Sequence, residues 1–251
     1  MNFTGKTAIS TGAASGMGLL FAQNFATLGG NIVLCDVNEQ VLNEKVAEIN
    51  AKGQGKAIGV ICDVRDYKQV CNARDKAVET FGSIDVMANF AGGTARRMLN
   101  VGFSEDFPDV PIEVFDWGLD VNLKGPFYFA HAVLAQMRKQ NSGLILNIGS
   151  ITGAEGSNSG LDYATAKAGV MYGLTKSLAQ FGAKYNIRCV CVSPGPVLTR
   201  AAMSKMKTLL RRAAEPQEIV DLCLFLASEK GQFINGENIM IDGGRNAMPR
   251  G

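Results

Sequence analysis

The chain contains one histidine and one tryptophan among 251 residues, so two residue types that often mark catalytic and binding sites are scarce. His131 has no cysteine, aspartate or glutamate at ligand spacing, and no CxxC pair occurs, so no metal site is predicted. A Ser-His-Asp hydrolase is excluded as well, because the sequence has no GxSxG nucleophile turn. His131 stands among aromatic residues in "FYFAHAVLAQM", and we expect it in the core or at an interface.

Long apolar runs and an excess of one charge are also missing. No run approaches membrane-spanning length, "MNFTGKTAIS" holds no apolar signal core, and the net charge is only +2. These absences argue against membrane and nucleic-acid partners. The cysteines lie mostly in apolar runs, which predicts buried free thiols and a reducing, cytoplasmic location. They are Cys35, Cys62, Cys71, Cys189, Cys191 and Cys223.

Short apolar segments alternate with longer amphipathic segments along the whole chain. Apolar character that continues through a strand is typical of parallel sheets with both faces covered. The expected strands are 6–11, 31–36, 57–63, 84–93, 143–150, 187–196 and 237–242. This order predicts an α/β protein with a doubly wound parallel sheet of about seven strands and helices on both faces. No linker or internal repeat is present, so residues 1–251 are expected to form a single domain.

A glycine-rich turn follows the first expected strand in "STGAASGMG". Gly12 permits a tight turn, Gly16 lets the backbone approach a pyrophosphate, and Gly18 allows close packing of helix against strand. The start of the following helix offers free N–H groups and a positive dipole end to phosphates. An ordinary glycine-rich turn is the alternative, but an acid at the end of the next strand favours a dinucleotide site.

That acid is Asp36, which closes "NIVLCD" and lies 18 residues beyond Gly18. A carboxylate at this spacing accepts hydrogen bonds from an adenosine ribose and repels a 2′-phosphate. No lysine or arginine occurs between residues 7 and 44 to offset it, so NAD is predicted rather than NADP. The alternative is that Asp36 caps the next helix, as "DVNEQ" would allow.

From Gly5 to about Gly244, the chain resembles the short-chain dehydrogenase/reductase family in its single-domain form, with a Rossmann-type fold. The motifs that carry the resemblance are TGAASGMG at 11–18, Asp63 in "CDV", "NFAG" at 89–92, Asn122 in "VNLKG", Ser150 in "NIGS", Tyr163 with Lys167, Pro194-Gly195, and the final "IDGG". Phe90 departs from the family, which often has a second Asn or a small residue there. We expect the backbone of this turn to matter more than the Phe90 side chain.

The resemblance implies that Asn122, Ser150, Tyr163 and Lys167 are catalytic. A free phenol has a pKa near 10, and a cation four residues along the same helix face would lower the pKa of Tyr163 toward its working range. Ser150 ends a strand, where its hydroxyl could donate to the substrate oxygen, or could satisfy a loop backbone group instead. By spacing alone, Tyr163 and Lys167 could equally be a half-buried and a solvated residue on an amphipathic helix.

The family further implies that Asn122 holds a water beside Lys167, although an Asn at a helix bend is the alternative. It assigns Asp63 and Val64 to the adenine and the 89–92 backbone to the ribose, and it assigns Val197 and Thr199 to the nicotinamide amide. Thr199 could also be a helix cap. The predicted cofactor-binding set is Gly12, Ser15, Gly16, Met17, Gly18, Asp36, Asp63, Val64, Asn89, Ala91, Gly92, Tyr163, Lys167, Pro194, Gly195, Val197 and Thr199. A homotetramer built on the two long helices and the last strand is also implied.

The predicted activity is hydride transfer between NAD and a secondary alcohol or ketone, such as a sugar, polyol or hydroxy acid, with Tyr163 as acid and base. Two alternatives are an NADPH-dependent 3-ketoacyl or carbonyl reductase and a non-catalytic nucleotide sensor. Residues 98–115 are expected to form an insertion and residues 196–215 a substrate lid. Arg96, Arg97 and the basic 200–212 segment could grip an anionic substrate, or could form a solvated surface facing Glu105, Asp106 and Asp109.

Overall fold

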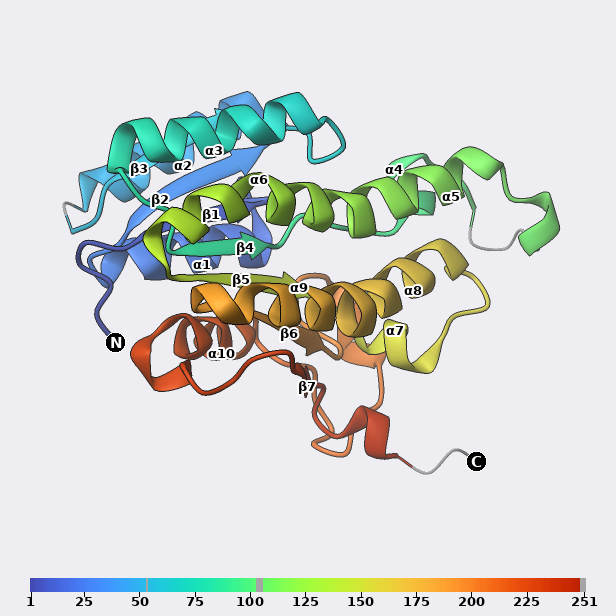
Figure 1. Cartoon of the computed structure of the whole chain (residues 1–251). Helices are drawn as coiled ribbons and strands as arrows, with labels where there is room; N and C mark the ends of the chain where they lie inside the picture. The colour runs from blue at the N-terminus through green and yellow to red at the C-terminus, as the bar shows by residue number, and fades with distance from the viewer. Residues whose placement is uncertain (53, 103–105, 249–251) are drawn as a thin grey trace.

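The structure is a computed structural model that describes residues 1–52, 54–102 and 106–248. Its described strands form one seven-stranded sheet in the order β3-β2-β1-β4-β5-β6-β7, and each neighbouring pair is parallel (Figure 1). The strands are β1 Thr7–Thr11, β2 Asn31–Asp36, β3 Ala57–Ile61, β4 Val86–Asn89, β5 Gly143–Ile148, β6 Ile187–Pro194 and β7 Asn238–Ile241. The predicted doubly wound parallel sheet is confirmed.

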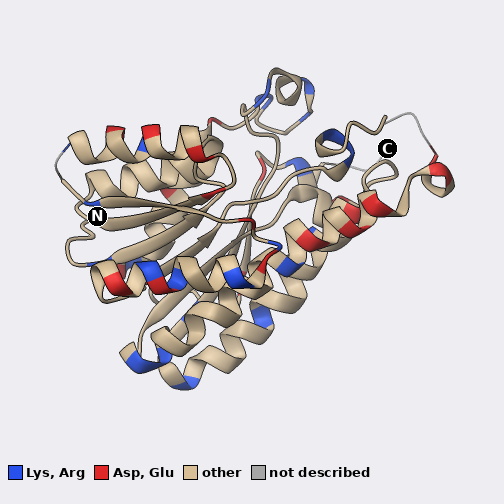
Figure 2. Ribbon diagram, turned by 90° about the horizontal axis from the view of Figure 1, so that it is seen from above, with Lys and Arg blue, Asp and Glu red and all other residues tan. Residues whose placement is uncertain are grey.

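Helices cover both faces of the sheet (Figures 1 and 2). On one face lie α1 (Gly16–Thr27), α2 (Glu39–Ala51) and α10 (Pro216–Ala227), and on the other lie α3 (Tyr67–Phe81), α6 (Gly125–Gln140) and α9 (Thr175–Gly182). Neighbouring strand residues point to opposite cores: Ala8 packs with Phe21 and Phe25 of α1, whereas Ile9 packs with the core that includes Phe129 of α6. Two buried faces explain why the strands are apolar throughout rather than alternating.

The carboxyl ends of the strands meet at one edge of the sheet, and the strand order reverses between β1 and β4. At such a reversal, the loops that follow neighbouring strands diverge and leave a crevice. Thr11 Oγ1 accepts from the backbone N–H of Ala91 at 2.9 Å, which joins the turn after β1 to the turn after β4. This edge therefore positions the glycine-rich turn and the "NFAGG" turn side by side.

Two long helical rods are each interrupted by a π-helical turn. One turn, η2 (Asp120–Lys124), joins α5 (Ile112–Leu119) to α6, and the other, η3 (Gly169–Leu174), joins α8 (Leu161–Ala168) to α9. Such turns leave local carbonyls unpaired along the helix and occur often at functional sites. Asn122 lies within η2, so its position at a helix irregularity has a structural basis.

The short helix α4 (Ala95–Met98) ends where the expected 98–115 insertion begins. That insertion contains the 3₁₀ helix η1 (Phe107–Asp109) and runs into α5, and Glu105 falls outside the described residues. The expected lid leaves β6, forms the 3₁₀ helix η5 (Ala201–Lys205) and returns through a bridge between Val197 and Ala214. Its far end is tied to the last turn of the chain, since Leu210 N–H donates to Gly243 O at 3.0 Å.

The six cysteines are free thiols, as predicted, and all but the half-buried Cys71 are buried. Within the part of the chain that the structure describes, no helix combines the length and apolarity that crossing a membrane requires. The other short elements are α7 (Ile151–Glu155) and the 3₁₀ helices η4 (Ala183–Tyr185), η6 (Glu229–Gly231) and η7 (Arg245–Ala247).

Candidate functional site

A cavity of about 510 Å³ lies at the carboxyl ends of β1, β2 and β3, and we call it the nucleotide cavity. Gly12 and Gly16 of the glycine-rich turn have φ values of +62° and +59°, which side-chain-bearing residues rarely adopt. A Cβ on Gly18 would lie 2.6 Å from the Gly12 carbonyl oxygen, so α1 packs directly against the strand end. A Cβ on Gly16 would meet no atom within 4 Å, so the space beside its backbone is open. Gly18 instead permits the close packing of helix against strand that the spacing predicted.

Asp36 lines the nucleotide cavity and is half-buried. Its Oδ2 accepts from the Ala14 N–H and its Oδ1 accepts from the Asn38 N–H, each at 3.0 Å. The cap of α2 is Asn38, whose side chain accepts from the Val41 N–H at 3.2 Å, so the alternative that Asp36 caps this helix is wrong. The glycine-rich turn thus orients the carboxylate, and each oxygen keeps further acceptor capacity.

Arg65 is a cation that lines the nucleotide cavity although it lies outside residues 7–44, where lysine and arginine are absent. It follows β3, and the sheet brings it opposite the end of β2. Its guanidinium binds Asp63 through contacts of 2.6 and 3.0 Å, and this pairing is the main reason that the pKa of Asp63 is lowered. Asp63 and Val64 line the cavity as predicted, but the Asp63 carboxylate is already engaged.

A second cavity of about 440 Å³ continues from the first along the same edge, and we call it the catalytic cavity. Met17, Phe90 and Gly92 line both cavities, so the two form one cleft. Predicted site residues that line the catalytic cavity are Met17, Gly92, Ser150, Tyr163, Lys167, Pro194, Gly195, Val197 and Thr199. Those that line the nucleotide cavity are Gly12, Ser15, Gly16, Met17, Gly18, Asp36, Asp63, Val64, Ala91 and Gly92.

Phe90 lines both cavities and so lies where they join, and the expectation that its backbone matters more than its side chain stays a prediction. Its ring packs against Phe21 of α1, with centroids 5.4 Å apart. An aromatic ring here forms part of the wall at the junction, where a small residue would leave a gap. In the sequence, the departure of Phe90 from the family pattern was the signal that could have pointed to this position.

Tyr163 of α8 and Ser150 at the end of β5 stand together in the catalytic cavity. The pKa of Tyr163 is raised rather than lowered, because burial of the phenol outweighs the opposing effects of the Ser150 hydroxyl and the Arg97 charge. The predicted lowering by Lys167 is therefore not found in the protein alone. Ser150 also caps α7 by accepting from the Thr152 N–H at 3.2 Å, so it satisfies a loop backbone group as the alternative expected. Its donation to a substrate oxygen stays a prediction.

Lys167 is buried, with 3% of its surface exposed. Its Nζ donates to the Ile148 carbonyl at 2.8 Å and lies 5.6 Å from the centroid of the Tyr163 ring. Burial lowers the pKa of Lys167 to about 8, so the ammonium form still dominates at neutral pH. The helical spacing thus places a desolvated cation beside the phenol, on the side that faces the cavity.

Two predicted residues, Asn122 and Asn89, are buried and do not line either cavity. The Asn122 side chain forms a pair of hydrogen bonds with the Gly93 backbone, at 3.0 and 2.9 Å, and also donates to the Gly118 carbonyl. Asn89 donates to Asn147 at 2.9 Å. Both side chains therefore stabilise segments next to the cavities without lining them. The predicted contacts of these residues with water or ribose would have to come from their backbone atoms.

The arginines considered for binding an anionic substrate occupy different environments in the structure. Arg96 is buried, with 2% of its surface exposed, and it donates to the Gly102 carbonyl, so it does not line the cavity. Arg97 and Arg200 do line the catalytic cavity. Arg212 is held by Glu218 at 2.6 Å, on the exposed start of α10. No ion pair joins the basic segment to Asp106 or Asp109 among the described residues.

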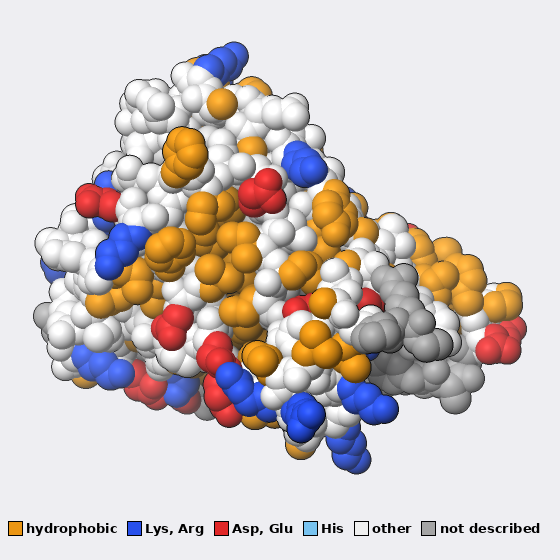
Figure 3. Space-filling model, turned by 90° about the horizontal axis from the view of Figure 1, so that it is seen from below, with side chains coloured by type: hydrophobic (Ala, Val, Ile, Leu, Met, Phe, Trp, Pro, Cys, Tyr) orange, Lys and Arg blue, Asp and Glu red, His pale blue; other side chains and the backbone are white. Residues whose placement is uncertain are grey.

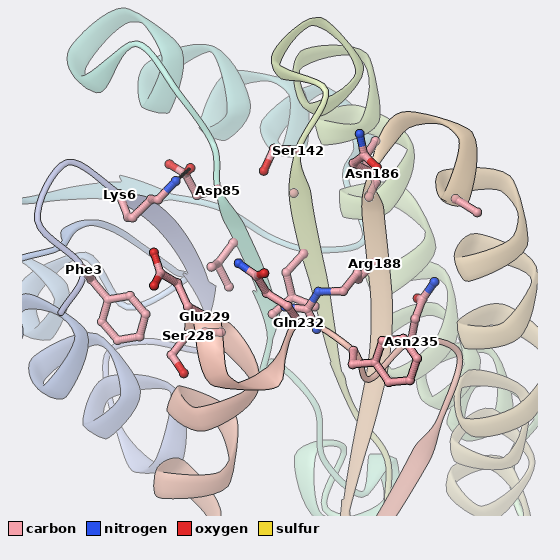
Figure 4. Close-up of a pocket in the computed structure, with 17 residues that line it drawn as sticks. Phe3, Lys6, Asp85, Ser142, Asn186, Arg188, Ser228, Glu229, Gln232 and Asn235 are labelled. Carbon is pink, nitrogen blue, oxygen red and sulfur yellow. Dashed lines mark hydrogen bonds and ion pairs between the residues drawn. The ribbon is translucent and has the colours of Figure 1, made fainter. Parts of the chain in front are cut away.

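A larger cavity of about 640 Å³ lies at the opposite edge of the sheet, near the amino ends of β1, β4, β5 and β6 (Figure 4). Its main charged groups are already bound within the wall. Lys6 pairs with Asp85 at 3.0 Å, and the Arg188 guanidinium donates to the carbonyls of Leu226, Gly231 and Ile234. These contacts join the wall segments to one another, and none of the predicted site residues lines this cavity.

His131 is exposed on α6, so it does not lie in the core, and its place at an interface stays a prediction. Its Nδ1 is hydrogen-bonded to the Tyr67 hydroxyl of α3, far along the chain. Tyr128 of the same helix also packs against the Tyr67 ring, with centroids 5.3 Å apart, whereas Phe129 is fully buried. His131 does not line the cleft.

Comparison with known proteins adds an independent line of support. Residues 12–246 match the family described as enoyl-(acyl carrier protein) reductase. The chain is 40% identical to trans-4-hydroxycyclohexanecarboxylate dehydrogenase of Sinomonas cyclohexanicum, over 96% of this chain and 93% of that protein. It is 35% identical to a 3-oxoacyl-[acyl-carrier-protein] reductase of Thermotoga maritima, over 97% of this chain and 99% of that protein.

Among solved structures, the chain resembles NAD⁺-bound xylitol dehydrogenase, with a TM-score of 0.88 and 29% identity. The match covers 97% of this chain and 100% of the other. These relatives act on different substrates, so the likeness defines the fold and the kind of reaction more closely than the substrate.

Proposed function

Because the chain belongs to the short-chain dehydrogenase/reductase family and is an oxidoreductase for alcohol or ketone groups, we propose that it transfers hydride between NAD and a secondary alcohol, with Tyr163 as acid and base. The observation that carries the proposal is the single cleft that joins Asp36 at one end to Ser150, Tyr163 and Lys167 at the other. A sensor of nucleotides would need only the first end.

The nucleotide cavity fits a dinucleotide. The open space before Gly16 leaves room for phosphates at the start of α1, whose N–H groups and dipole favour anions. Asp36 would accept from the adenosine ribose, and the predicted set from Pro194 to Thr199 lies at the far end of the cleft, where the nicotinamide would be held. When bound, the nicotinamide supplies or accepts the hydride.

In this mechanism Tyr163 moves the proton at its phenolic oxygen. During oxidation the phenolate accepts the alcohol proton, and during reduction the phenol returns it. The buried Lys167 ammonium stabilises the phenolate, which matters because burial alone raises the pKa of Tyr163. Ser150 orients the substrate oxygen beside the phenol, and the Asn122 contacts with Gly93 keep this wall in place.

The test is a substrate panel monitored by nicotinamide absorbance, with NAD and NADP at equal concentration. The panel contains 4-hydroxycyclohexanecarboxylate, cyclohexanol, xylitol and, for reduction, an acetoacetyl thioester. We expect oxidation of at least one alcohol with NAD, and loss of that oxidation in Tyr163→Phe without loss of NAD binding. Tight NAD binding with no turnover of any compound would instead favour the nucleotide sensor.

An NADPH-dependent ketoacyl or carbonyl reductase is the second candidate. It is favoured by the Thermotoga relative and by Arg65, a cation in the nucleotide cavity that could turn toward a 2′-phosphate. We prefer NAD because Arg65 is bound to Asp63, whereas Asp36 is aligned by the glycine-rich turn. Faster thioester reduction with NADPH than any alcohol oxidation with NAD would reverse this preference.

We also propose a homotetramer. Phe127, Tyr172 and Phe181 along the two long rods are exposed by 52%, 47% and 45%, and β7 is an edge strand whose four residues are only half-buried. Figure 3 shows hydrophobic side chains gathered over the middle of the face seen from below, the side where Figure 1 places α10 and β7. Light scattering after size-exclusion chromatography should give four times the mass of the chain, and a monomer would contradict the proposal.

The proposal treats residues 1–251 as one domain, because every described strand belongs to one sheet. A cytoplasmic location remains a prediction based on the free thiols, which a reducing compartment preserves. Cell fractionation tests it, and recovery in an oxidising compartment would count against it.

A further inference from the structure

The charged side chains of the catalytic cavity are all cationic in the part of the chain that the structure describes. Arg97, Lys167 and Arg200 line it, and no aspartate or glutamate does. Lys167 is accounted for by the carbonyl of Ile148 and by Tyr163. Arg97 of α4 and Arg200 before η5 have no ion-pair partner among the described residues.

Other arginines of the protein show what an engaged guanidinium looks like here. Arg65 binds Asp63, Arg212 binds Glu218, and Arg245 binds Glu155 at 3.0 Å. These three arginines outside the catalytic cavity are each paired with a carboxylate, whereas the two that line this cavity have no ion-pair partner among the described residues. A cavity with unpaired cations and no anion is suited to an anionic ligand.

We propose that Arg97 and Arg200 form an anion-binding subsite, and that the alcohol or ketone substrate carries a carboxylate. The inference rests on the proposed function, because it concerns the substrate of the same cavity. The two arginines come from segments about a hundred residues apart in sequence, α4 and the 196–215 segment, so only the folded chain brings them to one cavity.

The rest of the wall indicates a carboxylate on a carbon frame. Met203 and Met206 of the 196–215 segment give the cavity an apolar side, and Ser157 and Ser159 give it hydroxyl donors. A planar carboxylate matches the fork of one guanidinium, with a second guanidinium and hydroxyls for its remaining lone pairs. A polyhydroxylated phosphate ester would find little to bond to on the methionine side.

The test measures binding of cyclohexanecarboxylate and of its neutral carboxamide to the protein saturated with NADH, by calorimetry. It also measures inhibition by each probe with the best alcohol substrate. Wild-type protein should bind the carboxylate at least about 10-fold more tightly than the carboxamide, because a hydrogen bond to a charged group is the stronger one. Arg97→Gln and Arg200→Gln should each weaken carboxylate binding by about 10- to 100-fold and leave carboxamide binding unchanged.

Lys205→Gln is the matched control, because it removes the same charge from the same segment but does not line the cavity. It should bind both probes as the wild type does. Equal affinity of wild-type protein for the two probes, or equal losses in Lys205→Gln and Arg97→Gln, would overturn the subsite. Preference for phosphorylated alcohols over carboxylated ones in turnover would also overturn it.

Binding does not require hydride transfer, so the subsite and the proposed function fail in different ways. Tyr163→Phe should lose turnover and keep carboxylate binding. If wild-type protein binds the carboxylate through Arg97 but turns over nothing, the oxidoreductase proposal is wrong and the anion site stands. If alcohols turn over but charge has no effect on KM or binding, the reverse holds.

Discussion

At the nucleotide end of the cleft the polar groups bind one another, whereas at the catalytic end they face the cavity with few partners. Asp36 is held by two backbone N–H groups and Asp63 by Arg65. At the other end, Lys167 is buried with one carbonyl partner and Arg97 lines the open wall. The nucleotide end is therefore held in place by its own hydrogen bonds, whereas the catalytic end keeps charged side chains that have few partners. Such unpaired or buried charges serve function at the expense of stability.

The largest expected effect comes from removing the proton carrier at the catalytic end. Tyr163→Phe should lower kcat by about 10²- to 10⁴-fold, the usual contribution of a positioned acid or base. Fluorescence titration should show NAD affinity within about twofold of wild type, because the nucleotide end is untouched. Tyr185→Phe, at a half-buried tyrosine that does not line the cleft, is the control and should keep full turnover.

The next effect concerns the nucleotide end. Asp36→Asn keeps an acceptor for the Ala14 N–H but removes the charge that opposes a 2′-phosphate. The ratio of kcat/KM for NAD to that for NADP should fall by about 10- to 100-fold, since a charge-assisted contact is lost. The control is Glu44→Gln, an exposed acid on α2, and a ratio that is equally changed there would show that only net charge matters.

A third prediction is that a substitution at the catalytic end of the cleft raises the stability of the protein while it abolishes turnover. Lys167→Met removes a desolvated cation, so the free energy of unfolding at pH 7 should rise by about 1–3 kcal/mol while turnover is lost. The folded-state pKa of Lys167, about 8, lies below the ordinary 10.5, so the unfolded state binds more protons between these values. The wild type should therefore gain stability as pH rises through this window, and the advantage of the variant should shrink.

Urea unfolding at pH 7, 8 and 9 checks this expectation, with the exposed Lys176→Met as control. A variant that is less stable than wild type at every pH would mean that the hydrogen bond to the Ile148 carbonyl outweighs the desolvation of the ammonium.

The smallest expected effect is electrostatic. The charge of Arg97 opposes the rise that burial gives to the pKa of Tyr163. Arg97→Gln should therefore move the alkaline-rising limb of alcohol oxidation to higher pH, for a neutral alcohol as well as for a carboxylate. The shift will be small because Arg97 is exposed and screened by solvent. A limb that stays in place would limit Arg97 to substrate binding.

Much of the nucleotide end of the cleft could be predicted from local sequence motifs. The glycine spacing, the acid that ends β2 and the apolar strands predicted the sheet, the turn and the position of Asp36, because each depends on residues close together in the chain. The sequence did not reveal the contribution of a distant segment, since Arg65 reaches the same cavity from the end of β3.

Less of the catalytic end could be predicted from the sequence, because its properties depend more on tertiary packing. The spacing of Tyr163 and Lys167 follows from helix geometry, but the direction of the pKa shift of Tyr163 depends on burial, which no local pattern gives. The same holds for the neighbouring arginines, of which Arg96 is buried and Arg97 faces the cavity, because adjacent residues on a short helix point in different directions.

By itself, the sequence determined the order of strands and helices, the glycine-rich turn, and the types of residue available for chemistry, because periodicity and turn geometry act over a few residues. Only the tertiary structure decided which of those residues share a cavity, which are bound by distant partners and which keep an unpaired charge. Burial and electrostatics sum over all neighbours in space, and most neighbours of Tyr163, Arg97 and Arg200 are far from them along the chain.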